Sequence, residues 1–570
     1  MGWGNKMGET EEKAGMSVKA RIARRLNLLK SERAGWLPMY QDLSDYIQPY
    51  AGRFYVTDRN RGELHQFNNI IDDCATEALD ILAAGLMGGL TSPARPWFRL
   101  GVSDSKLRDD HDVKVWLAEC QRLLLDVFAK SNTYLALHNI YYELGLFGTA
   151  CSVVMDDFDT VIHHYTAPVG EFCLASDFRG RVNTLYREFQ KTVGEVVREF
   201  GYDNCSAATR ALYDRQSLDA WVTVCHAVEP REDRVTTRKD ARHKAWRSTY
   251  FEMRGDDKTL LRDSGFESFR VLAPRWHKTG GDIYGRSPGM RALGAVKQLQ
   301  HEQLRKAQGI DQLTRPALQV PMALKGADVD MLPGGVTYVD ASGSSSVRNL
   351  MEVGIDLNHL LADIEDTRRR IRAAFYSDLF LMISNSADVQ KTAAEIAERH
   401  EEKMLALGPV LERMETELLR PLIDIAFERC AKAGILPEPP EVLHGMPLEV
   451  EYISVLAQAQ RMIATNGIDR WVSGLGAVAQ FKPEVLDKFN ADRWADEYGD
   501  LLGVPPDLIN GDDVVAAQRQ QRAQAQAQAA QMQHAGAMAD AAAKLGKIPT
   551  TGGNVASDVM GQLTGYGPNS

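Results

Sequence analysis

The stretch that decides the fold is a pair of helical patterns joined by a Gly- and Pro-punctuated segment. Residues 286–310 read RSPGMRALGAVKQLQHEQLRKAQGI, and residues 355–376 read IDLNHLLADIEDTRRRIRAAFY. Ser287 is suited to cap the first helix, and Pro288 is preset for the first helical position. Apolar residues recur at helical spacing in both segments; they are Leu293, Val296, Leu299 and Leu304, then Leu357, Leu360, Leu361, Ile364, Ile371 and Phe375.

Between the two helices, the sequence predicts a small β-rich lobe. Three strand-like pieces cover residues 317–324, 335–340 and 349–353, and clusters of Gly, Pro and Ser separate them. One helix therefore leaves the body of the protein, the lobe turns the chain, and the second helix returns. The second helix also carries a charged face, made of Asp363, Glu365, Asp366, Arg368, Arg369, Arg370 and Arg372.

The composition limits the classes of protein that can contain this hairpin. The chain has 570 residues, 44% of them hydrophobic, so it can bury the cores of several domains. Its formal net charge of −11 argues against tight duplex binding by phosphate neutralisation, although DNA could still pass along such a surface. Seven cysteines without a CxxC pair, and no secretory leader pattern, indicate assembly in a reducing cytoplasm. The longest apolar run, residues 81–90, is too short for a bilayer span, so no membrane partner is expected.

The chain before the hairpin predicts a mixed α+β region in a protein that is mainly helical. Helical patterns cover 113–129 and 134–147, and strand-like pieces follow from residue 150 to residue 276. Trp97 and Phe98 lie in a Pro-rich segment and are expected to anchor packing. The basic helix from Lys19 to Arg33 is expected to be a solvated face, with nucleic acid or an acidic neighbour as the alternative contact.

After the hairpin, the pattern becomes polar and then helical again. Residues 377–391 are rich in small polar side chains, including Ser384, Asn385 and Ser386. Thr392 and Glu395 form a capping-box pattern, and Pro421 and Pro409 are expected to kink the helix that follows. From residue 516 alanine and glutamine alternate, which favours a helix that is ordered only if copies bundle together. The final residues, 550–570, are expected to be mobile.

One motif raises an enzymatic alternative. Residues 280–287, GGDIYGRS, have the frame of a phosphate loop between a strand and a helix. Arg286 replaces the lysine, and Pro288 removes a backbone donor, so a glycine turn that leads into a capped helix is the preferred interpretation. His163 and His164 would lie on opposite faces of a strand, which disfavours a metal site. The sequence predicts no enzyme, no cofactor and no metal.

The sequence resembles the portal, or head-to-tail connector, proteins of short-tailed bacteriophages (podoviruses). The matching stretches run in order from about residue 20 to residue 510. They are 86–100 (LMGGLTSPARPWFRL), 168–190 with GE at 170–171 and DFRG at 177–180, 226–230 (HAVEP), 274–276 (PRW), 284–289 (YGRSPG), 391–395 (KTAAE), 407–410 (LGPV) and 417–422 (ELLRPL).

The resemblance implies a structural virion protein that forms a ring, usually a dodecamer, at one capsid vertex. DNA would enter through the ring during genome packaging and leave through it at ejection. The implied partners are further copies of the chain, duplex DNA in the channel, the large terminase (the packaging ATPase), the major capsid and scaffolding proteins, and tail adaptor proteins.

The family's parts are carried onto this sequence by range. They are an N-terminal helical segment (1–60), a wing (61–285), a first stem helix (286–310), a clip (311–354), a second stem helix (355–376), a tunnel loop (377–391), a kinked wing or crown helix (392–433), a crown (434–512), and a barrel helix with a mobile tail (513–570).

A size argument agrees with a DNA channel. Twelve inner helices spaced about 10 Å apart form a circle roughly 38 Å across, which leaves roughly 28 Å of free width. Duplex DNA is roughly 20 Å wide and passes without a tight grip. The expected channel-facing residues are Lys306, Arg368, Arg369, Arg372 and Lys391, unless they form salt bridges between subunits. Two alternatives remain open: a nucleotide-driven motor that uses Gly280–Ser287, and a cytosolic helical scaffold without a pore.

Overall fold

The structure is a computed structural model. It describes residues 17–58, 69–102, 104, 107, 110–235, 237–238, 240–256, 259–314, 318–319, 348–349, 357–385, 407–443, 448–452, 471–479, 481–502 and 512–545. The chain divides into two compact units, Met1–Ser103 with Glu119–Gly476, and Asp104–Ala118 with Ala477–Ser570.

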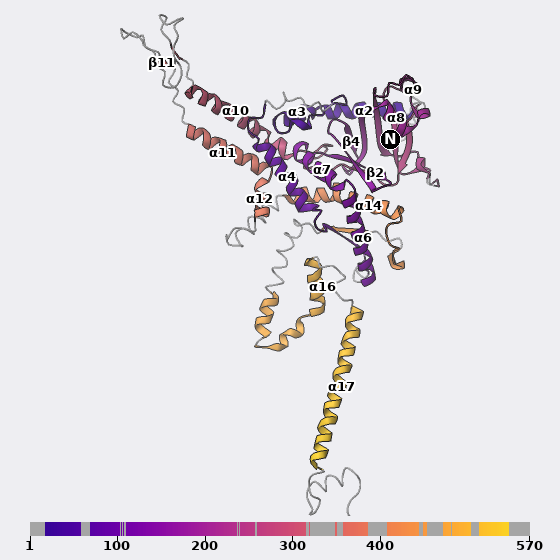
Figure 1. The fold of residues 1–570 in the computed structure, drawn as a ribbon, viewed down its shortest axis with the longest axis vertical. Helices are drawn as coiled ribbons and strands as arrows, with labels where there is room; N and C mark the ends of the chain where they lie inside the picture. Colours follow the sequence, from indigo (N-terminus) through magenta and orange to yellow (C-terminus); the bar gives the residue numbers. More distant parts are fainter. Residues whose placement is uncertain are drawn as a thin grey trace, which may run out of the picture. The chain divides into compact units, whose positions relative to one another are not determined.

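The first unit contains a five-stranded antiparallel sheet whose strands pair in chain order (Figure 1). Its strands are β4 (Phe172–Ser176), β5 (Val182–Thr192), β6 (Trp221–Pro230), β7 (Trp246–Glu252) and β8 (Arg262–Phe266). Tyr186 lies opposite Ala227, and His226 lies opposite Tyr250. Because successive side chains point to opposite faces, the sheet presents two apolar surfaces, and both are buried.

Helices cover both faces of this sheet. On one face α2 (Val18–Ala34) places its apolar stripe, Ile22, Leu26 and Leu29, against strand residues that include Tyr186 and Phe251. On the other face α8 (Val193–Phe200) packs Val196 and Phe200 against the opposite side of the same strands. The same part of the chain also contains three short helical elements, η3 (Tyr202–Asn204), α9 (Ala207–Asp214) and η4 (Ala241–His243).

Arg24 of α2 is exposed, but most of the basic side chains of this helix do not form the solvated face that the sequence suggested. Lys30 Nζ lies 2.5 Å from Glu188 Oε2, and both Arg21 and Arg25 pair with the buried Glu229. Arg33 is itself buried and donates to the main-chain oxygen of Val169 at 3.1 Å. The acidic neighbour, which was the alternative contact, therefore belongs to the same chain: it is Glu188 of β5 and Glu229 of β6.

A helical layer lies beside the sheet. It comprises α3 (Leu37–Tyr46), η1 (Pro49–Ala51), α4 (Cys74–Leu90), α6 (His111–Lys130) and α7 (Thr133–Phe147). Trp97 and Phe98 are fully buried, with ring centroids 4.7 Å apart, and both pack on Phe128 of α6. The expected packing anchor is confirmed. It leads into β1 (Phe98–Val102), which pairs with the distant β12 (Leu448–Tyr452).

A second, three-stranded sheet connects this layer to the later part of the chain. Its order is β3 (Val161–Ala167), β2 (Cys151–Asp157) and β9 (Val271–Leu272). The helix after residue 407 packs nearby and contains a π-helical segment, Glu415–Leu419, before α14 (Arg420–Lys432). Pro421 has no N–H, so a regular α-helical bond to Glu417 is impossible, and the wider turn lies where a kink was expected.

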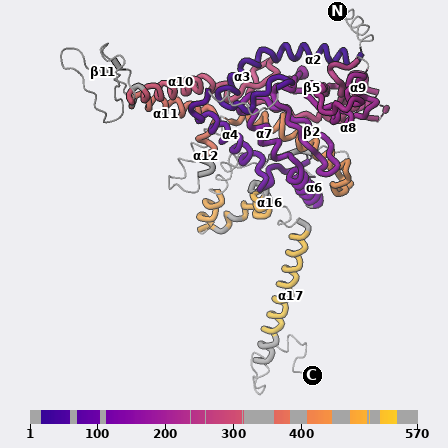
Figure 2. The backbone as a smooth tube through the Cα atoms, turned by 45° about the horizontal axis from the view of Figure 1, so that its top comes forward, coloured from indigo at the N-terminus to yellow at the C-terminus, as the bar shows by residue number. Residues whose placement is uncertain are grey.

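The hairpin extends from this body (Figures 1 and 2). α10 (Pro288–Thr314) leaves, α11 (Leu357–Ala374) returns beside it, and α12 (Ser377–Asn385) follows. Of the expected β-rich lobe, the structure describes only β10 (Leu318–Gln319) paired antiparallel with β11 (Arg348–Asn349). The strand predicted at 335–340, and the capping box at 392–395, lie outside the described residues.

The last described elements are mainly helical. They are η7 (Glu441–Leu443), a helical stretch at 471–479, η8 (Pro483–Lys488), α16 (Ala491–Leu502) and α17 (Asp512–Leu545). In the second unit, Arg519 of α17 pairs with Asp492 of α16 at 2.6 Å. α17 is a helix of 34 residues whose described side chains are almost all exposed, as expected for an Ala/Gln segment without an apolar stripe of its own.

The α+β, mainly helical class expected from the sequence is confirmed. Among the described residues, no helix combines the length and apolar character needed to cross a bilayer. The division into wing, stem, clip, tunnel loop, crown and barrel stays a prediction.

Substitution of two glycines of α4 tests the packing of α12 against that helix. A Cβ at Gly85 would lie 2.2 Å from Phe380 Cγ of α12, whereas a Cβ at Gly88 would meet nothing within 4 Å. We expect Gly85→Ala to lower the free energy of unfolding by about 1–3 kcal/mol through overpacking. Gly88→Ala should be neutral or stabilising because alanine favours helix. Thermal unfolding of both variants measures the difference, and equal transitions would contradict the docking.

Candidate channel hairpin

The hairpin begins where Ser287 closes the first turn of α10. Its Oγ accepts from Met290 N at 2.9 Å and donates to Leu146 O, at the end of α7, at 2.7 Å. Pro288 follows at the first helical position, so the cap predicted from the sequence is confirmed. The root of the hairpin is therefore fixed to the end of α7.

The glycine loop before this cap has the features of a structural turn. Gly285 N donates to Thr149 Oγ1 at 2.7 Å, and Arg286 N donates to His277 O at 2.7 Å. The Arg286 guanidinium lies over the ring of Trp36 and near Asp282. A phosphate cradle needs free main-chain donors and a mobile cation, and here the N–H groups of Gly285 and Arg286 and the Arg286 guanidinium already have partners. The geometry therefore favours the capped-helix interpretation over nucleotide binding.

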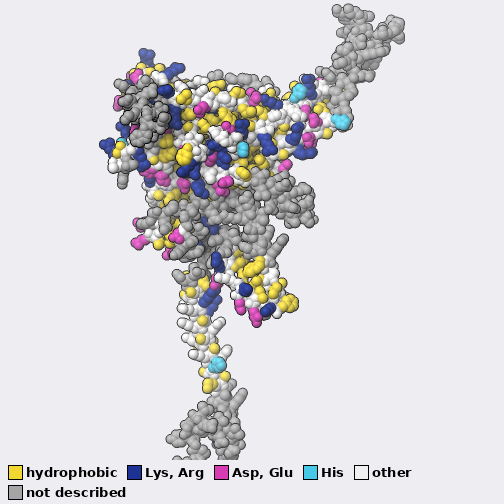
Figure 3. Space-filling model, turned by 180° about the vertical axis from the view of Figure 1, so that it is seen from behind, with side chains coloured by type: hydrophobic (Ala, Val, Ile, Leu, Met, Phe, Trp, Pro, Cys, Tyr) yellow, Lys and Arg dark blue, Asp and Glu magenta, His cyan; other side chains and the backbone are white. Residues whose placement is uncertain are grey.

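α10 and α11 lie side by side, and each carries buried apolar residues. Val296 and Leu299 of α10, and Ile364 and Ile371 of α11, are almost completely buried, as their helical spacing predicts. Leu304 of α10 and Leu361 of α11, which were expected on the same apolar stripes, are instead 42% and 44% exposed. Side chains of both charges cover the surface of the hairpin (Figure 3).

Asp72, just before α4, is the joint between the hairpin and the body. Its Oδ2 accepts from Arg368 Nη2 of α11 at 2.8 Å and from Gln303 Nε2 of α10 at 2.7 Å. Gln300 of α10 binds the same segment: its Oε1 accepts from Asp72 N at 2.9 Å, and its Nε2 donates to Asp72 O at 2.8 Å. One carboxylate thus ties both helices to the segment that leads into α4.

Burial alone would raise the pKa of Asp72. Hydrogen bonds from Arg368, from the main-chain N–H of Cys74 and from Gln303, together with the Arg368 charge, outweigh burial, so the pKa is lowered from its ordinary 3.8. The charged carboxylate is therefore the form that the folded state favours.

The structure places the candidate channel residues on several parts of the hairpin. Lys306 lies on α10 and is partly exposed. Arg368 is held by Asp72 within the same protomer. Arg369 is 71% exposed, 3.8 Å from Asp366, and Arg372 lies 3.5 Å from Glu365. Lys391 lies outside the described residues. The three described arginines are brought together along α11, each beside an acidic residue.

The segment after α11 begins as a helix where the sequence suggested a loop. Ser377 Oγ donates to Ala78 O of α4 at 3.4 Å, and Leu379 and Phe380 are buried. These apolar side chains explain why residues 377–385 fold against α4. Tyr376, at the junction, has a φ of 58° and packs 6.2 Å from Trp276. Ser384 and Asn385 end α12, and Ser386 lies outside the described residues.

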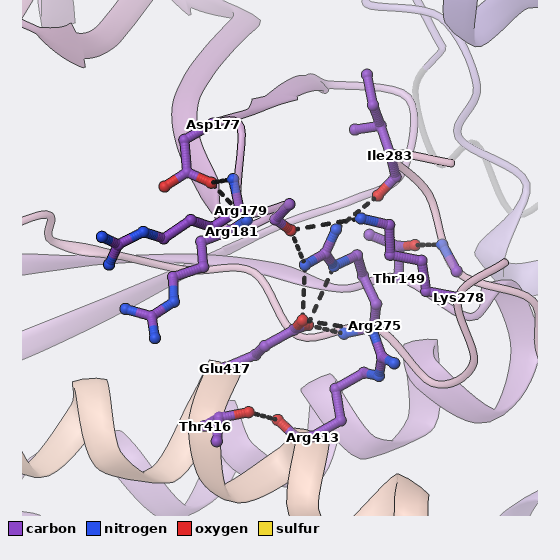
Figure 4. A network of polar contacts seen from close by, with 12 residues as sticks. Thr149, Asp177, Arg179, Arg181, Arg275, Lys278, Ile283, Arg413, Thr416 and Glu417 are labelled. Carbon is purple, nitrogen blue, oxygen red and sulfur yellow. Dashed lines mark hydrogen bonds and ion pairs between the residues drawn. The ribbon is translucent and has the colours of Figure 1, made fainter. Parts of the chain in front are cut away.

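A buried ion pair holds the root of the hairpin to the later helix (Figure 4). Arg275 is only 1% exposed, and its Nε and Nη2 contact the two oxygens of Glu417 at 3.0 and 2.6 Å. Arg275 N also donates to Glu417 at 3.0 Å, while the guanidinium donates to Gly180 O and Ile283 O. Four separate chain segments meet at one guanidinium.

Sequence reasoning missed this pair. Arg275 and Glu417 are 142 residues apart; both lie in stretches that carry the family resemblance, 274–276 and 417–422, but nothing in either stretch indicates that the two side chains meet. The available signal was Pro421, because the π-helical segment that accommodates the missing N–H carries Glu417.

The paired histidines hold no metal site. His163 is exposed and His164 is buried, as strand alternation predicts. Burial and the neighbouring His163 lower the pKa of His164 to about 4. Among the residues that the structure describes, no group of His, Cys, Asp or Glu could hold a metal ion.

With this geometry established, comparison with known proteins identifies the class. A model of the family described as "Bacteriophage head to tail connecting protein" matches residues 19–509. The chain belongs to this family, and the resemblance drawn from the sequence is confirmed.

Two relatives carry portal names. The chain is 55% identical over 539 residues to the "Probable portal protein" of Bordetella phage BPP-1, which covers 94% of this chain and 97% of that protein. It is 44% identical over 540 residues to the "Portal protein" of Salmonella phage epsilon15, covering 94% and 95%. Among solved structures, a chain from the neck of an empty GTA particle has a TM-score of 0.37 and 12% identity, covering 80% of this chain and 96% of that one.

Removing the Glu417 charge should destabilise the protein strongly. Glu417→Gln leaves the Arg275 guanidinium buried without a counter-charge, which costs about 3–5 kcal/mol. Glu412→Gln, at an exposed position on the same helix, is the matched control and should change stability little. Chemical denaturation measures both, and a Glu417→Gln loss no larger than that of the control would contradict the anchoring role.

Asp72 should make the hairpin joint sensitive to acid. Because its pKa is lower in the folded state, its contribution to stability is present above the unfolded pKa and is lost as pH falls through the folded pKa. Asp72→Asn should therefore lower stability at pH 7 by about 1–3 kcal/mol. The difference in the free energy of unfolding between this variant and the unmodified protein should narrow below about pH 4.

The exposed neighbour Asp73 provides the control, since Asp73→Asn removes the same charge without touching Arg368. Unfolding curves recorded from pH 7 to pH 3 for the three proteins separate the two positions. If the loss of stability in Asp72→Asn is the same at every pH, the charged Asp72 carboxylate does not hold the hairpin to the body.

Proposed function

We propose that this chain is the portal subunit of a short-tailed phage. Copies form a ring at one capsid vertex, and the ring is the channel through which DNA is packaged and ejected. The observation that carries this proposal is the family match across residues 19–509, which contains the whole helical hairpin. The ring is a structural component of the virion at the head-to-tail junction, and it is assembled in the host cytoplasm.

In this proposal the hairpin forms the stem of the ring. α10 has 27 residues and would span about 40 Å at 1.5 Å per residue. It lies beside α11 along the hairpin, and Asp72 binds both helices. The stem arrangement supports a channel wall of twelve such units with clearance for a double strand.

The proposed partners follow from this position. The segment between α10 and α11 is the clip in this proposal, where the packaging ATPase docks and tail adaptor proteins later bind. Major capsid and scaffolding proteins contact the ring at the vertex. The tunnel loop predicted at 377–391 is limited to residues after Asn385, because α12 packs against α4. Residues 434–512 would be the crown, and α17 would contribute to a barrel of helices. No cofactor and no catalytic step are proposed for the chain.

Among the candidate channel residues, we favour Arg369, Arg372, Lys306 and Lys391 for contact with passing DNA. The charge of Arg368 is already bound to Asp72, so its loss would act mainly through stability. The acidic residues beside Arg369 and Arg372 moderate their attraction for phosphate. A channel surface with balanced charge would let DNA slide rather than bind.

Neutralising the exposed arginines tests the channel. In Arg369→Gln with Arg372→Gln, we expect rings to form normally while genome packaging or retention changes several-fold, because phosphate contacts are lost. Lys130→Gln, an exposed position at the end of α6, is the control. Negative-stain images score rings, and nuclease-protected DNA in assembled heads scores packaging. Unchanged packaging with intact rings would exclude these residues.

The two alternatives are separated by direct measurements. A nucleotide-driven motor would bind labelled ATP saturably, and Arg286→Ala would abolish that binding. A scaffold without a pore would show no central opening in images of the unmodified protein.

A further inference from the structure

Two hairpin turns in the first unit share one design. The β2–β3 turn reads Asp157-Phe158-Asp159-Thr160, and the β4–β5 turn reads Asp177-Phe178-Arg179-Gly180-Arg181. In each turn the first aspartate accepts hydrogen bonds from the residues that follow. Asp157 accepts from Thr160 Oγ1 at 2.5 Å. Asp177 accepts from the main-chain N–H groups of Arg179 and Arg181, both at 2.9 Å.

Each turn presents a phenylalanine entirely to solvent. Phe158 is 106% exposed and Phe178 is 93% exposed, the two highest values among the large hydrophobic residues described. A phenylalanine at the tip of a well-ordered turn adds nothing to the core of its own protomer. Aromatic residues and arginine are enriched where proteins contact one another.

The two tips carry opposite charge. Asp159 is exposed beside Phe158, whereas Arg179 and Arg181 are exposed beside Phe178. Figure 4 shows the Arg179 and Arg181 side chains extending away from the Arg275–Glu417 pair. Arg179 stacks 5.2 Å from the Phe178 ring, and no ion pair to either arginine is found within the described part of the chain.

Both tips are held against one helix at separate points. The β4–β5 turn is fixed through Gly180 O, which accepts from Arg275, the partner of Glu417. The β2–β3 hairpin is fixed through Asp156, which pairs with Arg429 at 3.1 Å. Twelve residues separate Glu417 from Arg429, or about 18 Å of helix. One protomer therefore presents the tips as two distinct, rigid contacts.

We propose that the Phe178 turn of one copy contacts the Phe158 turn of the next copy in a ring. A ring interface joins two different surfaces of the same chain, and these two surfaces are complementary in charge and equally apolar. The partner is a second copy because the chain itself contains both members of the pair. This inference rests on the proposed ring but adds which residues join its subunits.

A charge swap in the full-length chain tests the pairing. Arg179→Glu with Arg181→Glu should raise the concentration needed for ring assembly at least tenfold, because like charges then face each other. Asp159→Arg alone should also weaken assembly. Combining all three substitutions should restore rings, since the charges are complementary again. Mass photometry across a dilution series measures assembly, and negative-stain images identify rings.

Controls separate this contact from folding and from other partners. Arg198→Glu with Arg215→Glu reverses two exposed arginines elsewhere and should leave assembly unchanged. Phe178→Ala should weaken assembly without a change in thermal unfolding. Unaltered assembly in the Arg179/Arg181 variant, or failure of the triple variant to recover, would overturn the pairing.

Two further outcomes are informative. If the Arg179/Arg181 variant forms normal rings but loses salt-dependent binding of a duplex DNA probe, the tip binds nucleic acid and the pairing is wrong. If the unmodified chain itself forms no rings, the proposed function fails as well. Rings from the unmodified chain with no effect of any variant would refute only the pairing.

Discussion

The contact between Arg275 and Glu417 is the constraint on which the rest of the structure depends. A fully buried guanidinium is tolerated only when its charge and its donors are satisfied, and here one side chain achieves this with three other segments of the chain. The turn after β4, the loop before α10 and the π-helical segment are positioned by the same group. The hairpin can project from the body because its root is fixed there and at Asp72.

Charge within this protein is used mainly for internal fixation. The basic helix α2 is neutralised by Glu188 and Glu229 of the sheet, and Arg368 is neutralised by Asp72. Buried pairs of this kind specify which surfaces meet, although they contribute less to net stability than their geometry suggests. Exposed charges on α11 and on the β-hairpin turns at Phe158 and Phe178 are among those available for contacts outside the protomer.

Local pattern predicted the helical hairpin, its Ser287 cap and the Trp97–Phe98 anchor, because each depends on residues close in sequence. Long-range pairs could not be predicted: Asp72 with Arg368, and Arg275 with Glu417, are set by how distant segments pack. Residues 377–391 were expected to be polar and to resemble a loop, but residues 379–383 are the apolar run LFLMI, and Leu379 and Phe380 are buried in a helix. The signal for this helix was therefore present in the local sequence. The sequence predicted the helix, α11, that carries the candidate channel arginines. Whether each one is free could not be predicted, because Arg368 pairs with Asp72, which lies far away in the sequence.

The left-handed backbone at Tyr376 has a mechanical consequence. A non-glycine residue with a φ of 58° holds roughly 1–2 kcal/mol of conformational strain. A positive φ does not fit a regular α-helix, so α11 and α12 are two separate helices rather than one continuous rod. Several contacts hold the chain after this break: Ser377 Oγ donates to Ala78 O, Leu379 is buried, and Phe380 lies where a Cβ on Gly85 of α4 would be. The direction that the chain takes after the hairpin is therefore set by the packing of α12 on α4.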